Sequence, residues 1–480
     1  MENGQGEWKN EASRPKDNII VRNFWKCNTQ KGGEDMCRIP QYAAEVLAAL
    51  EAAGHEAWCV GGCVRDSLLG RTPQDWDVTT SARPEAVMDI FADRAVPTGL
   101  AHGTVTVKTG GGPVEVTTFR RDGTYRDHRR PQTVTFTDSL EEDLCRRDFT
   151  INAMALDLRG DLADPLGGRA DLAAGVLRCV GEPDQRFRED ALRILRGVRF
   201  AAALGFTLEP ETDRSLRANR SLLSEIAPER IWSELCGLLV ASGAEAALRA
   251  YPEVIGVFWP EILEMVGFPQ RNRHHCYDVW EHTLHALGAV PSELILRLTM
   301  LLHDIGKPSC CTLDENGCGH FRGHPARSAA MAENMLRRLR ADNDTRETVT
   351  RLVFWHDRNI PRTRPGVARA LRQLGETDLR RLFLIKRADN LAQDPAYRSM
   401  QAEIDKAERI LNQLLAEKSC VSLEQLAVRG GDLLALGFVG PAVGRTLKVL
   451  LDQVVEEQLP NERTILLEYA RHLQEKTPKA

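Results

Sequence analysis

The hydrophobic pattern of this chain changes character once along its length. Early in the sequence, short apolar runs such as Ala57–Val60, Thr104–Lys108 and Val114–Phe119 alternate with segments of helical period. Such alternation predicts a small domain built around a sheet. From Asp184 onward the pattern is almost entirely helical, with glycine and proline between the helices. The predicted fold class is therefore α+β, with a sheet-containing head followed by all-helical regions.

Composition excludes several classes of protein. The 480 residues are 42% hydrophobic and 27% charged, which rules out a wholly disordered or collagen-like chain. Uncharged stretches are too short for a membrane-spanning helix, which needs ~20 apolar residues. The twelve cysteines form no CxxC pair and no apolar signal region opens the sequence, so a cytoplasmic protein with reduced thiols is expected. Because the net charge is −5, nucleic-acid binding would have to use local basic surface.

A glycine pair marks the first candidate site. Gly61 and Gly62 stand between a predicted strand and a predicted helix. Glycines let the backbone approach a ligand closely, and a helix N-terminus favours phosphate. Arg65 adds a cation that phosphate oxygens can use. A glycine pair alone is usually only a turn, so this signal gains weight from the residues that follow it.

Two aspartates follow the glycine pair, and their spacing indicates a metal site. Asp75 and Asp77 are two residues apart, so on a strand both would face the same side. Two hard oxygen ligands suit Mg²⁺. Glu115 lies in an apolar predicted strand and is our candidate for a third carboxylate. A lone DxD pair is commonly a solvated loop, but the glycine pair and the carboxylates together favour a nucleotidyl-transfer site.

The combined stretch is also similar to a known family. GGCVRDSLLGRTPQDWDVTT resembles the nucleotidyltransferase signature of the polymerase-β superfamily. More narrowly, it resembles the class II tRNA nucleotidyltransferases, the CCA-adding enzymes, and the related bacterial poly(A) polymerases. Three further motifs follow in the family's order: RRDFTINAMA from Arg146, DPLGG from Asp164 and EDALR from Glu189. The resemblance extends over roughly residues 36–480.

The resemblance implies roles for a row of polar residues. Asp190 and Arg193 would imitate the Watson–Crick edge of a base and so select C or A. Asp190 and Arg193 are three residues apart on a predicted helix, so we expect them to share a face, which Arg196 and Arg199 continue. The alternative is a basic helix face that only contacts water.

Residues around the second motif would contact the rest of the nucleotide. Arg146 and Arg147 are expected to bind triphosphate and ribose, with Asp148 orienting one of them. Asn152 would either reach the sugar or cap a turn. The arginine-rich segment 120–131 corresponds to a flexible loop that, in the family, helps to switch from C to A addition; a solvated loop is the alternative.

Histidines define a second candidate site. Eight of the twelve histidines fall between residues 274 and 356, and His303-Asp304 stands in a stretch, LLHDIGKP, that resembles the HD-domain phosphohydrolase signature. Imidazole and carboxylate ligands together indicate a divalent transition metal. No role is assigned to four other histidines, at 274, 275, 285 and 320. The predicted ligands, in the HD order, are His282, His303, Asp304, His324, His356 and Asp389.

Nucleic-acid contacts are predicted at two further places. Residues 351–387 carry ten Lys and Arg against three Asp and Glu, which suggests a phosphate-contacting face. The alternative is that these arginines only coat helices. The glycine-broken segment after Val428 resembles the C-terminal part of HD-bearing family members, where backbone N–H groups could meet phosphates.

The predicted organisation has five parts. These are a disordered extension over 1–35, a nucleotidyltransferase head over 36–157, a neck over 158–270, an HD domain over 271–395 and a helical tail over 396–480. The predicted function is template-independent addition of CCA to tRNA from CTP and ATP, with Mg²⁺ at Asp75 and Asp77 and a possible HD phosphohydrolase activity. No membrane is expected as a partner, and the oligomeric state is left open.

Other functions remain open from the sequence. A poly(A) polymerase, or an enzyme adding only part of the triplet, would use the same head. A metal-dependent phosphohydrolase whose head merely binds nucleotide belongs to another class. A non-catalytic RNA-binding protein is disfavoured because both predicted metal sites keep their carboxylates.

Overall fold

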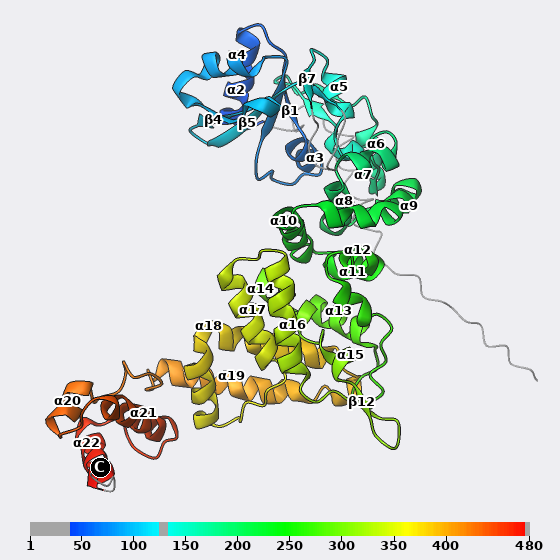
Figure 1. Ribbon diagram of the computed structural model, residues 1–480. Helices are drawn as coiled ribbons and strands as arrows, with labels where there is room; N and C mark the ends of the chain where they lie inside the picture. The colour runs from blue at the N-terminus through cyan, green and yellow to red at the C-terminus, as the bar shows by residue number, and fades with distance from the viewer. Residues whose placement is uncertain (1–38, 124–132, 476–480) are drawn as a thin grey trace, which may run out of the picture. The chain divides into compact units, whose positions relative to one another are not determined.

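The computed structural model describes residues 39–123 and 133–475 (Figure 1). They form two compact units. Of the described residues, the first comprises 39–121, 134–147 and 151–168, and the second comprises 122–123, 133, 148–150 and 169–475. The predicted extension over 1–35 and most of the arginine-rich segment 120–131 lie outside the described residues.

The first unit is built on a seven-stranded mixed sheet. Its strand order is β3-β4-β5-β2-β1-β8-β9. Strands β2 and β5 pair in parallel, while the other neighbours are antiparallel. Helices α2 and α4 pack together on the sheet (Figure 1). The elements are α2 (Gln41–Ala52), β1 (Ala57–Val60), α3 (Gly62–Leu68), β2 (Asp77–Thr80), α4 (Pro84–Phe91), β3 (Ala95–Gly99), β4 (Thr104–Thr109), β5 (Gly112–Thr118), β6 (Arg120–Asp122), β7 (Val134–Phe136), α5 (Leu140–Cys145), β8 (Ala155–Leu156) and β9 (Leu162–Ala163).

Local sequence explains these elements. In β5 the side chains of Val114 and Val116 are buried while Glu115 between them is exposed, which is the period of two that a strand imposes. In α2 the apolar positions at helical spacing face the sheet, and Gly54 follows the helix with a φ of 87°. That left-handed conformation favours glycine. The predicted strands and helices of the head are confirmed.

The second unit is mainly helical. Its continuous part begins with α6 (Gly168–Ala174), and its only described strands are two short pairs. These are β10 (Val176–Leu177) with β11 (Thr207–Leu208) and β12 (Thr312–Leu313) with β13 (Gly319–His320). The α+β fold class is confirmed. The helices are α7 (Pro183–Glu189), α8 (Leu192–Leu204), α9 (Pro210–Asn219), α10 (Pro228–Leu239), α11 (Ala244–Ala250), α12 (Pro252–Ile255), α13 (Val279–Ala289), α14 (Leu294–Leu302), α15 (Lys307–Cys310), α16 (His324–Arg338), α17 (Asn343–Trp355), α18 (Arg364–Leu391), α19 (Met400–Ala416), α20 (Gly430–Ala435), α21 (Pro441–Val455) and α22 (Arg463–Glu475).

A helical bundle organises the middle of this unit. Helices α13, α14, α16, α17 and α18 pack against one another, and α19 runs along α18 (Figure 1). Their apolar faces share one continuous core, in which the buried Trp259 ring donates a hydrogen bond to the carbonyl of Met335. Helix α18 is broken at Gly375, whose φ of 74° is outside the helical region. Within the described residues, no helix has both the length and the apolar character needed to cross a membrane.

Candidate catalytic and metal sites

Three carboxylates come together where β2 begins. Asp77 is the first residue of β2 and pairs in register with Glu115 on the parallel strand β5. Asp75 lies two residues earlier and is exposed. Burial, followed by the charges of Asp75 and Glu115, raises the pKa of Asp77 to about 6, although the Arg147 guanidinium opposes this. Such concentrated negative charge is a place where a cation is favoured.

Two details of the sequence prediction need correction here. Asp75 does not share a strand with Asp77, because β2 begins only at Asp77; the two carboxylates are neighbours through the loop before the strand. Glu115 is not a carboxylate enclosed by an apolar strand either. It stands on the exposed face, while Val114 and Val116 point into the core.

Arginines flank the glycine turn. Gly61 has a φ of 85°, and a Cβ there would lie 3.4 Å from Nη1 of Arg147. A Cβ on Gly62 would lie 3.6 Å from Nη2 of Arg65. Arg65 is held in place, since it donates to both oxygens of Asp66 at 2.8 and 2.9 Å and to Oδ1 of Asn152 at 2.7 Å. Asn152 is buried, so its observed role is to support Arg65.

A fully buried carboxylate, Asp143, holds the two arginines of the RRD motif. It accepts hydrogen bonds from Nε of Arg146 at 2.9 Å, from Nη2 of Arg147 at 3.2 Å and from Oγ1 of Thr79 at 3.1 Å. Burial opposes the charge of Asp143, but the two arginines outweigh it and lower its pKa. Thr79 follows Asp77 on β2, so Asp143 ties both arginines to the strand of the carboxylates.

Sequence reasoning missed Asp143 and gave its role to Asp148. The signal was available, because Asp143 precedes Arg146 and Arg147 by three and four residues at the end of α5, where such pairs meet. The side chain of Asp148 instead accepts from Nε and Nη2 of Arg196 at 2.9 and 2.7 Å.

The second unit places Asp190 and Arg193 differently from the prediction. Asp190 follows α7 in an extended conformation, with φ of −134° and ψ of 100°, so the two residues do not share one helix face. Its carboxylate pairs with Arg230 at 2.9 Å. Arg193, on α8, is buried and donates from Nη1 to Glu189 Oε2 and to the carbonyl of Arg186, each at 3.1 Å. Arg193 is therefore held in a fixed direction by groups on α7.

Arg196 and Arg199 continue along α8 as predicted, but neither is a simple solvated cation. Arg199 donates to Oε2 of Glu234 at 2.5 Å, and Arg196 lies 3.6 Å from the other oxygen of that carboxylate. Both guanidinium groups also lie over the ring of Phe200, at 4.3 and 5.2 Å from its centroid. Burial opposes the charge of Arg196, but the carboxylates of Asp148 and Glu234 outweigh this effect and raise the pKa of Arg196.

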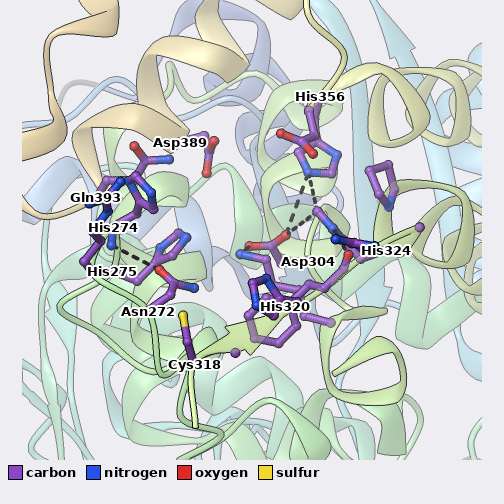
Figure 2. A pocket seen from close by; sticks show the side chains of 18 residues that line it. Asn272, His274, His275, Asp304, Cys318, His320, His324, His356, Asp389 and Gln393 are labelled. Carbon is purple, nitrogen blue, oxygen red and sulfur yellow. Dashed lines mark hydrogen bonds and ion pairs between the residues drawn. The ribbon is translucent and has the colours of Figure 1, made fainter. Parts of the chain in front are cut away.

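The six predicted HD ligands converge in the helical bundle. Figure 2 shows four of them, Asp304, His324, His356 and Asp389, around one pocket. They form two groups that share Asp304. In one group, Nε2 of His303 lies 3.0 Å from Asp304 Oδ2, and Nε2 of His282 lies 2.9 Å from Asp389 Oδ1. In the other, Nε2 of His324 lies 3.4 Å from Asp304 Oδ1 and 3.2 Å from Nε2 of His356. We call these six side chains the His/Asp cluster.

The four imidazoles all turn the same nitrogen toward the centre of the cluster. Each Nδ1 faces a backbone carbonyl instead, at distances between 2.6 and 3.2 Å. A carbonyl accepts a hydrogen bond from Nδ1–H, which leaves the lone pair on Nε2 for a metal. The carbonyls belong to Ala392, Met300, Phe321 and Val353.

Unsatisfied atoms also fit a cation at the cluster. Both carboxylate oxygens of Asp304 and Nε2 of His303 are buried and make no hydrogen bond to any described residue, although charged neighbours lie within ion-pair distance. Burial disfavours charge on His303, yet Asp304 and Asp389 outweigh it and raise the pKa of His303 to about 10, so a metal bound here would displace the proton from Nε2. Mixed nitrogen and oxygen ligands suit a divalent transition metal, and a shared carboxylate can bridge two ions.

A cavity of about 650 Å³ opens onto the cluster, and further residues line it. Lys307 donates from Nζ to Gln270 at 2.8 Å and lies 2.7 Å from Asp304 Oδ2. His275, which was assigned no role, packs edge-on against His282 with 4.8 Å between ring centroids. Two sequence features could have drawn attention to these residues: Lys307 follows Asp304 by three positions, and His275 lies in the histidine-rich stretch. Neither feature indicates where the side chain lies relative to the predicted ligands.

The basic window 351–387 is largely neutralised. Arg364 pairs with Glu417 and Glu457, Arg369 and Arg372 with acids on or beside α21, and Arg387 with acids on α19. Arg351 and Arg381 likewise contact Asp378. The net charge of the window therefore does not describe an open phosphate-contacting face, and the alternative, arginines coating helices, is what the contacts show.

Family models match three parts of the chain. The poly A polymerase head domain matches residues 57–178. The probable RNA and SrmB-binding site of polymerase A matches residues 205–253. The second domain of a tRNA nucleotidyltransferase family matches residues 326–470.

Curated relatives match over most of the chain. A CCA-adding enzyme of Lactiplantibacillus plantarum is 34% identical over 90% of this chain and 96% of its own length. One of Limosilactobacillus fermentum is 36% identical over the same shares. One of Geobacillus stearothermophilus is 50% identical, but over 44% of this chain and 52% of its own length.

Solved structures agree in fold. The CCA-adding enzyme of Bacillus stearothermophilus in complex with CTP aligns with a TM-score of 0.67 and 30% identity, over 91% of this chain and 97% of that one. The CCA-adding enzyme of Thermotoga maritima, complexed with tRNA_CCA, aligns with a TM-score of 0.57 at 18% identity, a likeness of fold alone.

Proposed function

The chain belongs to the family of CCA-adding enzymes, and we propose that it adds C, C and A to the 3′ end of tRNA, using CTP and ATP and releasing pyrophosphate. The observation that carries the proposal is the meeting of Asp75, Asp77 and Glu115 at the start of β2. Oxygen ligands of this kind suit Mg²⁺.

Residues of the head have distinct tasks in this reaction. The 3′-hydroxyl of the RNA attacks the α-phosphorus of the nucleotide, and the bond to pyrophosphate breaks. Mg²⁺ at Asp75 and Asp77 would supply charge that favours the alkoxide and stabilises the departing pyrophosphate. Arg65 and Arg147, on either side of the glycine turn, would hold phosphate oxygens.

Base selection is assigned to the second unit. Arg193 presents guanidinium donors and Asp190 a carboxylate acceptor, the complementary pair that the edge of a base requires. The fixed direction of Arg193, imposed by Glu189 and the carbonyl of Arg186, supports selection by a rigid protein template. Asp148 and Glu234 hold Arg196 and Arg199 in the same way.

The test is nucleotide incorporation on tRNA that ends at the discriminator base. CTP alone should add two residues, ATP alone none, and both together the full triplet, read by sequencing the 3′ ends. Long A tracts from ATP would instead identify a poly(A) polymerase, and a stop after CC or a requirement for preformed CC would identify a partial-adding enzyme.

We also propose a second activity, hydrolysis of phosphoesters at the His/Asp cluster. It is supported by two ligand groups that share Asp304 and by four imidazoles with Nε2 turned inward. A transition metal bound there would polarise the ester and activate water. The first substrates to try are 2′,3′-cyclic phosphates at RNA ends. Opening of the cyclic phosphate to a terminal 2′- or 3′-phosphate, by protein loaded with Mn, Fe, Co, Ni or Zn in turn, tests this activity.

A further inference from the structure

A smaller cavity also reaches the His/Asp cluster. It measures about 300 Å³ and lies among the C-terminal end of α17, helix α18 and helix α19. Its lining and that of the larger cavity have His356, Asp357, Asp389 and Gln393 in common. Two of these are cluster ligands, so the cavities meet at the cluster and a ligand in the smaller one would touch the metal centre.

The inner wall of this cavity is apolar. Ile360, Phe383, Ile404 and Ala407 line it, and each is at least nine-tenths buried. They come from α18, α19 and the segment after α17, so three separate parts of the chain enclose the space. A wall of this kind favours a flat, weakly polar group, and a cavity of this volume is at the lower end for small-molecule sites.

Polar groups stand around this apolar wall. The amides of Asn359 and Gln393 offer both donors and acceptors. Arg362 donates to Oδ1 of Asn359 at 2.6 Å and lies 3.5 Å from Glu403. Apolar walls with hydrogen-bonding edges match a nucleobase, whose faces are apolar and whose edges are polar.

A cation stands where the cavity meets the cluster. Lys386 lines the cavity and donates from Nζ to the backbone carbonyl of His356 at 2.6 Å. It therefore sits beside a cluster ligand, where the phosphate of a bound nucleotide would have to lie. An apolar pocket that ends in a lysine and then in metal ligands has the order of groups found along a nucleotide, from base to phosphate.

We propose that the smaller cavity binds the nucleoside of the hydrolysed substrate, so that the cluster acts on a nucleotide at the end of a chain or free in solution. This rests on the proposed phosphohydrolase activity. Hydrolysis forms a bond from phosphorus to the oxygen of water and breaks the bond to a ribose oxygen. One proton of the water leaves with that ribose oxygen, and the other stays on the phosphate or passes to solvent.

The experiment compares a substrate with a nucleoside and one without. Ala407→Leu fills the inner wall, and Met400→Trp obstructs the cavity from a more exposed position. Ala402→Trp, on the same helix but outside the lining, is the matched control. Each metal-loaded protein is assayed on 2′,3′-cyclic CMP and on cyclic ethylene phosphate, which has the cyclic phosphodiester but no nucleoside, with melting temperature as the check on folding.

Both filling variants should lower kcat/KM for the cyclic nucleotide at least tenfold and leave that for cyclic ethylene phosphate within twofold, while Ala402→Trp changes neither. Unchanged turnover of the cyclic nucleotide in both would overturn the proposal. Equal losses on both substrates would also overturn it, since the cavity would then act through the metal centre.

Failure of the hydrolase proposal has a different signature, namely no turnover of either substrate by the loaded unmodified protein. The cavity is then judged by the binding of 2′-CMP to the loaded protein and its variants, measured by saturation-transfer NMR. Binding that Ala407→Leu removes and Ala402→Trp keeps supports a nucleoside site, and equal binding in all variants rejects it.

Discussion

Asp77 and Glu115 occupy directly opposed positions on the parallel strands β2 and β5. Because the two strands run in the same direction, neither residue can be reached from the other through a hairpin, and their sequence separation says nothing about their proximity. The pairing adds a third carboxylate to Asp75 and Asp77. The charge of Glu115 raises the pKa of Asp77, although burial and the charge of Asp75 have larger effects.

Asp77→Ala should abolish nucleotide addition without unfolding the head. Loss of a ligand removes charge stabilisation worth several kcal/mol at the transition state, so a fall of at least about a thousandfold in CTP incorporation is expected. Asp89→Ala, an exposed acid on α4, is the control and should be unaffected. CTP incorporation by the Asp77 variant at close to the unmodified rate would show that the site lies elsewhere.

Cation binding at the head should weaken at acid pH. The pKa of Asp77 is raised to about 6 by burial and by its acidic neighbours, so below that pH a proton competes with the metal. Affinity for Mn²⁺ should be level above pH 7 and fall roughly tenfold per pH unit below 6. Binding is measured by titration with Mn²⁺ followed by electron paramagnetic resonance. A His303→Ala/Asp304→Ala protein is used, so that the His/Asp cluster does not contribute. Glu115→Gln should move the pH at which affinity begins to fall to a lower value. If that pH did not change, Glu115 would not influence the titration of Asp77.

Asp143→Asn should weaken nucleotide binding more than it slows chemistry. The change removes the charge that holds Arg146 and Arg147, so KM for CTP should rise at least tenfold while kcat falls less. Breaking a buried ion pair costs about 3–5 kcal/mol of stability. Glu141→Gln, an exposed neighbour on α5, should match the unmodified enzyme.

The same variant has a pH signature in unfolding. The folded-state pKa of Asp143 is lowered, because its arginines outweigh the effect of burial. Its charge therefore adds stability above the unfolded-state pKa, and that stability is lost as pH falls through the folded value. The stability difference between the two proteins should shrink in acid. A constant difference would mean that the lost contribution is packing and not charge.

Arg193→Ala should relax base selection more than it weakens triphosphate binding. Removing the guanidinium deletes the donors that complement the base, and it also removes one of the two arginine partners of Glu189 while Arg186 remains. Incorporation of UTP and GTP relative to CTP and ATP should rise about tenfold or more, corresponding to one good bidentate contact of ~1–3 kcal/mol. Arg214→Ala, an exposed arginine on α9, provides the comparison. An unchanged preference profile would remove Arg193 from the template.

His303→Ala with Asp304→Ala should separate the two activities. The pair supplies ligands to both groups of the cluster, so bound transition metal, measured by mass spectrometry on protein purified without chelator, should be lost. Hydrolysis of cyclic phosphate should vanish with it, while CCA addition stays within twofold. His472→Ala, in the tail, should keep the metal. A metal-free cluster in the unmodified protein would reduce it to a scaffold.

Sequence alone determined the fold class, and it predicted residues that the structure brings together at both candidate sites. A strand period of two cannot be confused with a helical period over several residues, so the head and the helical regions separated cleanly. Ordered motifs with unusual polar residues, such as His303-Asp304 or Arg146-Arg147, identified the chemistry because these residue types have few structural reasons to recur in that order.

Tertiary structure decided which polar groups act on one another. A break between α7 and α8 moved Asp190 off the helix of Arg193 and beside Arg230. Acids distant in sequence neutralised the basic window, since ion pairs depend on spatial and not sequence neighbours. The spacing of Asp143 from Arg146 and Arg147 was readable in the sequence, but only the structure shows that this carboxylate is fully buried beside Thr79. Periodicity encodes which face of an element is buried, but the partners on that face come from the packing of the whole chain.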